Sequence, residues 1–383
     1  MKIAHVLGHN SNWSIDSYNN QNIGDNFLIT AYSHGMKFLT KKSFQNILDL
    51  SMIDLQYYGK KHSKGKLSEF DFHPSNVSSD DVTNVYFENC LKQAIKFQQE
   101  NNFSNIIIPH LYEDEEVYSI VQTIKNINKY VSKIKRNGEK YFMTLPFANH
   151  IIVDKAKVEE ILFECTDMDI CFDGFFVVCE NKPETRRKLS INLKLMKNLA
   201  RVLKTLKDQG FETIYGYANW DAVIYLAHTD IDYITIGTYE NLRNFDIKRF
   251  TEDESGGGSK GYYFSEKLLN MVRADDITLL RGMDCLEYIR NERNIFSDII
   301  LEEGFPWNIH KPDVNKNYLL AISRLLNNIS GFTDIEERRK YVSGLVKNAI
   351  DTYDQINDKG VYLDKISDNY HLSTWRAFLS LSI

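Results

Sequence analysis

The chain has 383 residues and a formal charge of −6, because 46 lysine and arginine residues face 52 aspartate and glutamate residues. Hydrophobic residues make up 43% and charged residues 26%, as in a globular protein rather than a disordered or fibrous one. A nucleic-acid-binding protein carries a basic footprint, so a nucleic-acid partner is not expected. No apolar run approaches the roughly 18 residues of a membrane span, and the first residues do not form a signal peptide. We therefore expect a soluble, cytoplasmic protein with no membrane partner.

The five cysteines form no C-x-x-C pair. A disulfide framework and a four-thiolate zinc site are therefore not expected. Cys171 and Cys179 flank an apolar run, and we interpret them as small buried hydrophobic residues. We predict no cofactor, although the sequence leaves open a metal site assembled from scattered strand ends.

Short apolar runs rich in β-branched residues alternate with longer helical segments. The runs that we predict as strands cover residues 3–7, 46–50, 106–110, 140–145, 174–178, 213–217, 233–237 and 277–280. Several are apolar at nearly every position, which is typical of strands buried on both faces of a parallel sheet.

Helical periodicity fills the intervals between these runs. In residues 192–209, for example, apolar side chains form one stripe at 3.6-residue spacing, and Gly210 ends the pattern. Helices are predicted over 114–136, 154–164, 192–209 and 264–272 and, after the last strand, over 318–329, 335–356 and 369–381.

Eight strand–helix units are the number that closes a (β/α)8 barrel. We therefore predict an α/β fold, with a TIM-like barrel over residues 1–300 and a helical C-terminal extension over 301–383 packed on it. The alternative is an open, doubly wound parallel sheet. That fold would carry a glycine-rich turn after its first strand, and Gly8-His9-Asn10 lacks the G-x-G-x-x-G spacing.

Active sites of such barrels lie at the carboxyl ends of the strands, so polar residues that follow a predicted strand are candidates. These residues are His9, Asn10, His110, Tyr112, Asn149, His150, Glu180, Asn181, Asn219, Asp221, Thr238, Glu240, Arg281 and Asp284. The candidate catalytic residues are Glu180, Glu240, His110 and Asp221. The candidate substrate-binding residues are Asn219, Trp220, Tyr112, Arg243, Gly257 and Lys260.

Glu180 and Glu240 each follow an apolar strand. Carboxyl groups at the opening of an apolar barrel can act as an acid and as a base or nucleophile, the pair that cleavage of a glycosidic bond requires. The alternative is that Glu180 begins a solvated loop and that Glu240 caps a helix or pairs with Arg243.

His110 and Asp221 each have a structural alternative as well. A histidine titrates near neutral pH and could transfer a proton, but a lone histidine beside an apolar strand is commonly a hydrogen-bonded packing residue. Asp221 is a candidate catalytic residue by its place after a strand, or it could be the N-cap of the helix that follows it.

Trp220 and Asn219 could hold a ring, by stacking and by reading its polar edge. The glycine-rich stretch 255–261, which contains Gly257 and Lys260, could bind phosphate through its backbone N–H groups. A mobile lid or a plain flexible loop is the alternative interpretation of this stretch.

Together these features predict an enzyme, a hydrolase or transferase acting on the glycosidic bond of a small sugar-like or nucleoside-like ligand. The alternative is a non-catalytic scaffold that binds a partner through its C-terminal helices. An exposed aromatic patch would mark that scaffold, and its members would be Trp307, Tyr353, Tyr370 and Trp375. The sequence does not predict an oligomeric state.

Overall fold

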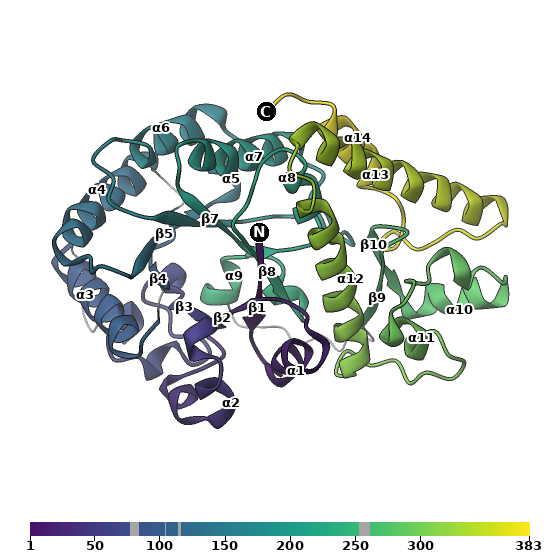
Figure 1. The fold of residues 1–383 in the computed structure, drawn as a ribbon, viewed down its shortest axis with the longest axis horizontal. Helices are drawn as coiled ribbons and strands as arrows, with labels where there is room; N and C mark the ends of the chain where they lie inside the picture. The colour runs from purple at the N-terminus through teal and green to yellow at the C-terminus, as the bar shows by residue number, and fades with distance from the viewer. Residues whose placement is uncertain (77–83, 104, 114–115, 253–260) are drawn as a thin grey trace.

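The computed structural model describes the whole chain except residues 77–83, 104, 114–115 and 253–260. Eight parallel strands form a nearly closed, barrel-shaped sheet flanked by helices, which confirms the predicted (β/α)8 barrel (Figure 1). The strands are β1 (Lys2–Leu7), β2 (Asn26–Thr30), β3 (Ser51–Asp54), β4 (Asn105–Ile108), β5 (Lys140–Phe147), β6 (Gly174–Cys179), β7 (Glu212–Ala218) and β8 (Tyr233–Gly237). Their order in the sheet is β3-β2-β1-β8-β7-β6-β5-β4, and β3 and β4 lie side by side where the ring meets.

The edge of β4 that faces β3 is capped by a side chain. In a parallel strand the backbone N–H and carbonyl of one residue point to the same side, and those of Ile107 face the Gln98 side chain. The Gln98 side chain accepts the Ile107 N–H at 2.9 Å and donates to the Ile107 carbonyl at 2.9 Å. The buried Gln98 amide thus replaces the hydrogen bonds that a neighbouring strand would make to Ile107. This lowers the free-energy cost of burying unpaired backbone groups at the edge of β4.

Helices form the outer layer of the barrel, and several begin where the sequence places a cap. Asn192 accepts the backbone N–H of Lys194 at 3.0 Å at the start of α7, and Asp154 accepts that of Ala156 at 2.9 Å at the start of α6. The helices up to β8 are α1 (Asn12–Gln21), α2 (Lys42–Gln45), α3 (Asn84–Glu100), α4 (Val117–Ile134), α5 (Asn149–Ile152), α6 (Lys155–Cys165), α7 (Leu193–Asp208) and α8 (Ala222–Leu226).

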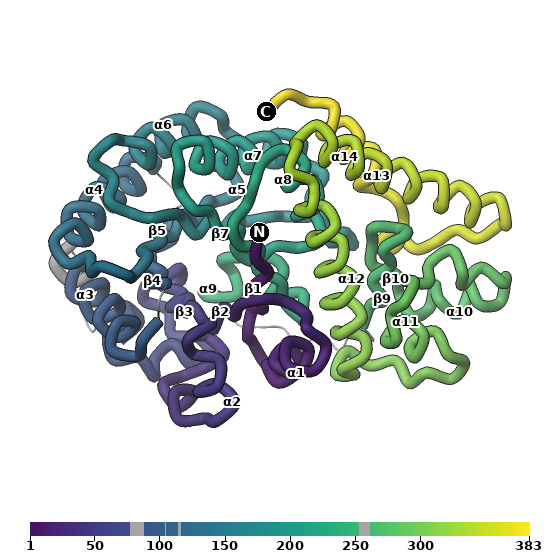
Figure 2. Tube along the Cα trace, viewed as in Figure 1, coloured from purple at the N-terminus to yellow at the C-terminus, as the bar shows by residue number. Residues whose placement is uncertain are grey.

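The chain after β8 leaves the barrel and then returns to it. It forms α9 (Lys248–Thr251), an antiparallel hairpin of β9 (Tyr262–Ser265) and β10 (Asn270–Arg273), α10 (Ala274–Gly282) and α11 (Ile295–Ile300). Next, α12 (Pro312–Ser330) packs against α1 and α8, the position of the eighth barrel helix. The last helices, α13 (Ile335–Asp358) and α14 (Leu372–Leu379), lie on the same side of the barrel as the hairpin (Figures 1 and 2). The first helix of the predicted extension thus completes the barrel wall.

Three predicted elements differ from the structure. Residues 46–50 are turn and 3-10 helix, because the strand there begins at Ser51, and β2 was not predicted at all. Residues 277–280 belong to α10: Ile277 and Leu280 are buried while Leu279 is 43% exposed, a helical rather than a strand-like burial period. Residues 264–272 form the β9–β10 hairpin instead of a helix, since an apolar run alone does not separate the two.

We call the N-terminal end of the barrel its floor. The same kind of hydrogen bond, from a backbone N–H to an aspartate, links neighbouring strands there three times. Three strands are each preceded by an aspartate whose carboxylate accepts the backbone N–H of the second residue in a neighbouring strand. The pairs, each at 2.8 Å, are Asp25 with Ile3, Asp173 with Tyr141 and Asp232 with Thr213. None of the described helices is long and apolar enough to cross a membrane.

Candidate active site at the mouth of the barrel

Glu180 lies directly after β6 at the C-terminal end of the barrel, which we call the mouth. Its side chain is 1% exposed. One carboxylate oxygen, Oε2, accepts the Tyr112 hydroxyl at 3.0 Å and the Asn149 backbone N–H at 3.1 Å, and Lys182 Nζ lies 3.1 Å away. The other oxygen, Oε1, has no hydrogen-bond partner among the described residues. Glu180 is thus a buried, oriented carboxylate with one oxygen available, not the start of a solvated loop.

His110 follows β4 and is fully buried. Its Nδ1 contacts the carbonyl of Leu111, which can only accept, so Nδ1 carries the proton and Nε2 is left as an acceptor. Nε2 has no partner among the described residues. Burial lowers the pKa of His110 to about 4, so the ring is neutral at physiological pH. A neutral imidazole with a free acceptor suits a hydrogen bond to a ligand better than it suits proton donation.

A second buried carboxyl, Asp54, lies at the end of β3 and was not predicted. It accepts the hydroxyls of Tyr217 at 2.7 Å and of Tyr58 at 3.0 Å, and the Gln56 backbone N–H at 2.9 Å. Burial raises the pKa of Asp54 to about 6 despite these donors. The sequence signal was Asp54 directly after the apolar Met52-Ile53, and it was lost because the strand was placed at 46–50.

Tyr217 reaches Asp54 because β7 is irregular. Residues two apart in a strand point to the same face, yet Tyr215 packs on Tyr225 of α8 outside the barrel while Tyr217 bonds to β3. The register between β7 and β8 shifts between Tyr215 and Ala218, and Tyr217 has a φ of 53°. Such bulges redirect a side chain and are common next to active sites, and a left-handed non-glycine residue stores strain there.

The segment after β8, residues 239–251, covers the mouth, and we call it the covering segment. The ring of Phe245 lies 4.9 Å from that of Tyr58, 5.9 Å from Tyr217 and 6.0 Å from Tyr112, side chains from three different strand ends. Its backbone also pairs with that of Glu180 in an isolated parallel bridge. At the mouth, Phe245 therefore packs on the tyrosines whose hydroxyls bond to the buried carboxyl groups of Asp54 and Glu180.

The predicted triplet after β7 lies at the rim of the mouth and is buried. Asp221 occupies the N-cap position of α8 without a side-chain cap, and its Oδ1 accepts no well-formed hydrogen bond from a described residue. Burial outweighs the nearby backbone N–H groups and raises the pKa of Asp221 to about 7. The Trp220 ring packs 5.8 Å from Phe264, with its indole N–H lacking a described partner, and Asn219 accepts the Trp220 backbone N–H. Trp220 is thus a packing residue whose indole N–H has no described acceptor, and its buried ring does not serve as a surface on which a ligand could stack.

Glu180 directly follows Cys179, the last residue of β6, whereas the Oδ2 of Asp221 accepts the Tyr215 hydroxyl at 3.4 Å. Burial raises the pKa of the Cys179 thiol, and the nearby negative charges of Asp221 and Glu180 raise it further. Asp221 thus lies on the α8 side of this strand end, where Tyr215 packs, and Glu180 bonds to Tyr112 and Asn149. Arg243, a predicted binding residue, instead stacks over the ring of Tyr318 at 4.3 Å.

Other predicted residues lie apart from this group. The Glu240 side chain is 54% exposed and pairs with Lys188 at 2.6 Å, the surroundings of a surface ion pair. Arg281 and Asp284, predicted after an eighth strand, are wrong as strand-end residues, because Arg281 lies in α10 and Asp284 just beyond it. Gly257 and Lys260 fall outside the described residues.

The aromatic residues that would mark a scaffold are not an exposed patch. Tyr353 and Trp375 are buried, and Trp307 and Tyr370 are partly buried. Tyr353 donates to the Ser367 carbonyl at 2.7 Å, so it belongs to the seam between the last helices and the rest of the molecule.

Comparison of the chain with protein-family models, with curated proteins and with solved structures gave no match. Two surface cavities, of about 450 Å³ between α3 and α4 and of about 270 Å³ near the floor, contain none of the predicted site residues. Within the described part of the chain, no three His, Cys, Asp or Glu side chains come together in a way that could hold a metal ion. The predicted site residues that contact one another, Glu180, Tyr112 and Asn149, lie at the mouth.

Proposed function

We propose that the chain is an enzyme that hydrolyses or transfers a glycosidic bond in a sugar-like or nucleoside-like substrate, with Glu180 as its central carboxylate. One observation carries the proposal: Glu180 is fully buried, one oxygen is fixed by three donors, and the other has no partner among the described residues. A buried polar atom without a hydrogen bond costs about 1–3 kcal/mol. Such a cost is typical of a functional site, where a ligand supplies the missing partner.

Asp221, predicted from the sequence, and Asp54 are the two candidates for the second catalytic carboxyl, because burial raises the pKa of each. A pKa of about 7 leaves a large fraction of Asp221 protonated at neutral pH, as a general acid requires. In this mechanism Asp221 donates a proton to the leaving group, while Glu180 acts as nucleophile or as base toward water. Glu240 was the partner predicted from the sequence, but its half-exposed side chain pairs with Lys188.

In this proposal substrate enters when the covering segment moves, because Phe245 packs on Tyr58 and Tyr112 and its backbone pairs with Glu180. Loops that close over a barrel mouth and exclude water are a common device of enzymes. His110 Nε2 and the Trp220 indole N–H, both without described partners, would then supply an acceptor and a donor for the substrate. As part of the same proposal we place the enzyme in the cytoplasm, since all five cysteines are free thiols.

The scaffold alternative is favoured by one observation, the aromatic filling of the mouth. In a non-catalytic scaffold, Phe245 would fill the mouth permanently, and the buried polar groups of the mouth would bind no ligand. The scaffold lacks its expected marker, however, since Tyr353 and Trp375 are buried in a seam.

The proposal is tested by incubating the protein with a panel of aryl glycosides and nucleosides and measuring release of the aglycone or base. We expect turnover by the wild type and a loss of at least about 100-fold for Glu180→Gln. The control Asp208→Asn, which changes an exposed carboxyl of α7, should keep a rate within about twofold of wild type. A Glu180→Gln variant with the wild-type rate would remove Glu180 from the mechanism. Absence of turnover of either substrate class by the wild type would contradict the proposed chemistry.

A further inference from the structure

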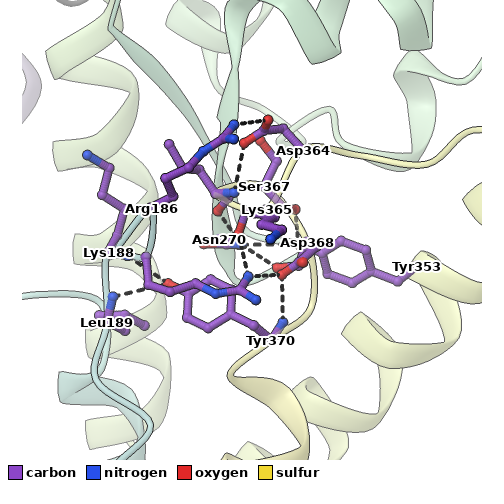
Figure 3. Close-up of polar contacts among 12 residues, drawn as sticks. Arg186, Lys188, Leu189, Asn270, Tyr353, Asp364, Lys365, Ser367, Asp368 and Tyr370 are labelled. Atoms are coloured by element: carbon purple, nitrogen blue, oxygen red, sulfur yellow. Dashed lines mark hydrogen bonds and ion pairs between the residues drawn. The ribbon is translucent and has the colours of Figure 1, made fainter. Parts of the chain in front are cut away.

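Residues 361–371, between α13 and α14, run beside the β9–β10 hairpin, and we call them the C-terminal strap (Figure 3). The Asn270 side chain of β10 donates to the Asp368 carbonyl at 2.8 Å and to the Ile366 carbonyl at 3.3 Å. The Ser367 hydroxyl accepts the Arg273 backbone N–H at 3.0 Å and donates to the Asp276 carboxylate at 2.5 Å. The strap is thus anchored to the hairpin and to α10 by hydrogen bonds to both backbone and side chains.

The opposite side of the strap binds the loop that follows β6 and begins with Glu180. The Tyr370 hydroxyl accepts two consecutive backbone N–H groups of this loop, those of Lys188 and Leu189, each at 3.0 Å (Figure 3). The Arg187 guanidinium lies 4.2 Å from the centre of the Tyr370 ring and pairs with Asp368 at 2.6 Å. One tyrosine side chain therefore fixes the loop through its oxygen and through its ring face.

Lys188 connects the loop after β6 to the covering segment. Its ammonium group pairs with Glu240 at 2.6 Å and lies 4.4 Å over the ring of Tyr262 at the start of β9. The same loop touches the covering segment at its other end, where Glu180 bridges to Phe245. The Lys188 side chain is only 15% exposed, so its pair with Glu240 is partly shielded from water.

We propose that the C-terminal strap is a latch: Tyr370 fixes the loop after β6, and through Lys188 this loop holds the covering segment closed over the barrel mouth. The C-terminal helices would then control access to the mouth. The latch rests on the proposed function only in calling the mouth an active site. The contacts themselves are independent of any substrate, so the test below needs none.

The experiment is amide hydrogen exchange, followed by NMR or mass spectrometry, on the wild type and on Tyr370→Phe, Lys188→Met and Tyr362→Phe. Tyr370→Phe keeps the ring and removes the oxygen that accepts two N–H groups. We expect the amides of Lys188 and Leu189 to exchange at least about tenfold faster in this variant, and the covering segment to exchange faster with them. Lys188→Met should speed exchange in the covering segment alone.

Tyr362→Phe is the matched control, since Tyr362 belongs to the strap but is 75% exposed, and it should exchange like the wild type. Unchanged exchange in β6 of every variant would show that the fold is retained. Wild-type exchange at Lys188 and Leu189 in Tyr370→Phe would overturn the latch. Faster exchange at those amides, with wild-type exchange of the covering segment in both variants, would overturn its link to the mouth.

Discussion

The carboxyl groups at the floor and at the mouth of the barrel differ in their burial and in their hydrogen bonds. At the floor, the aspartates before β2, β6 and β8 each accept a backbone N–H, and Asp232 also pairs with Lys207 at 2.7 Å. At the mouth, oxygen or nitrogen atoms of Glu180, His110 and Asp221 lack a described partner. The exposed or partly exposed aspartates of the floor thus bond to backbone, whereas the buried carboxyl groups of Glu180 and Asp221 at the mouth each keep an oxygen without a described partner. Polar groups that serve a reaction are expected at this end of a barrel. A hydroxyl at the floor, Thr213 Oγ1, also lacks a described partner.

The largest expected effect comes from the mouth and depends on pH. Burial raises the pKa of Asp221 to about 7 from its ordinary 3.8, so the folded state binds this proton more tightly than the unfolded state. Stability therefore falls as pH rises through the window between these values. Between pH 5 and pH 8 the wild type should lose about 2–3 kcal/mol that Asp221→Asn does not lose. Urea unfolding of both proteins at the two pH values measures the difference. Parallel pH dependence of the two would show that Asp221 is not a buried acid.

A somewhat smaller effect is expected at the floor. Asp232→Ala removes the acceptor of the Thr213 N–H at 2.8 Å and the partner of Lys207, and should lower the free energy of unfolding by about 2 kcal/mol. Asp208→Ala, which breaks only the exposed i,i+4 pair with Lys204, is the control and should cost less than about 0.5 kcal/mol. Denaturant unfolding at pH 7 gives the free energy of unfolding of both variants. Equal losses in Asp232→Ala and Asp208→Ala would mean that the hydrogen bond of Asp232 at the floor adds no stability beyond that of a surface ion pair.

The smallest effect concerns Glu240, which lies beside the mouth without belonging to its buried groups. Glu240→Gln removes a half-exposed ion pair with Lys188 and should change the free energy of unfolding by less than about 1 kcal/mol. Thermal or urea unfolding gives the value. A loss well above this figure would place Glu240 among the groups that hold the molecule together.

Much of the fold could be predicted from the sequence because buried parallel strands and amphipathic helices have strong local patterns. The strands from Ile106 to Gly237 and helix α7 follow directly from them. The predicted number of eight strands rested on two errors that offset each other, the missing β2 and the supposed strand at 277–280. Short runs such as Ile277-Thr-Leu-Leu280 fit a strand and a helix equally, and only packing decides between them.

The candidate site was less predictable, because its geometry depends on distant parts of the chain. Glu180 could be found from its place after β6, but its environment is made by Tyr112 and Asn149 from two other strand ends. Tyr217 faces the barrel only because β7 is irregular, and no pattern in the sequence of β7 predicts this irregularity. The covering of the mouth by Phe245 follows from a segment that carries no motif.

The central claim, that the mouth is an active site built around Glu180, is tested most directly by chemical rescue. Glu180→Ala removes the carboxylate and leaves space for a small anion, so turnover of a glycoside or nucleoside should be lost and then be restored in part by added sodium formate. The measured quantity is the rate of product release as a function of formate concentration, with the wild type as reference. A rate that rises with formate in the variant alone is the expected result. A Glu180→Ala variant that works at the wild-type rate without formate would contradict the claim.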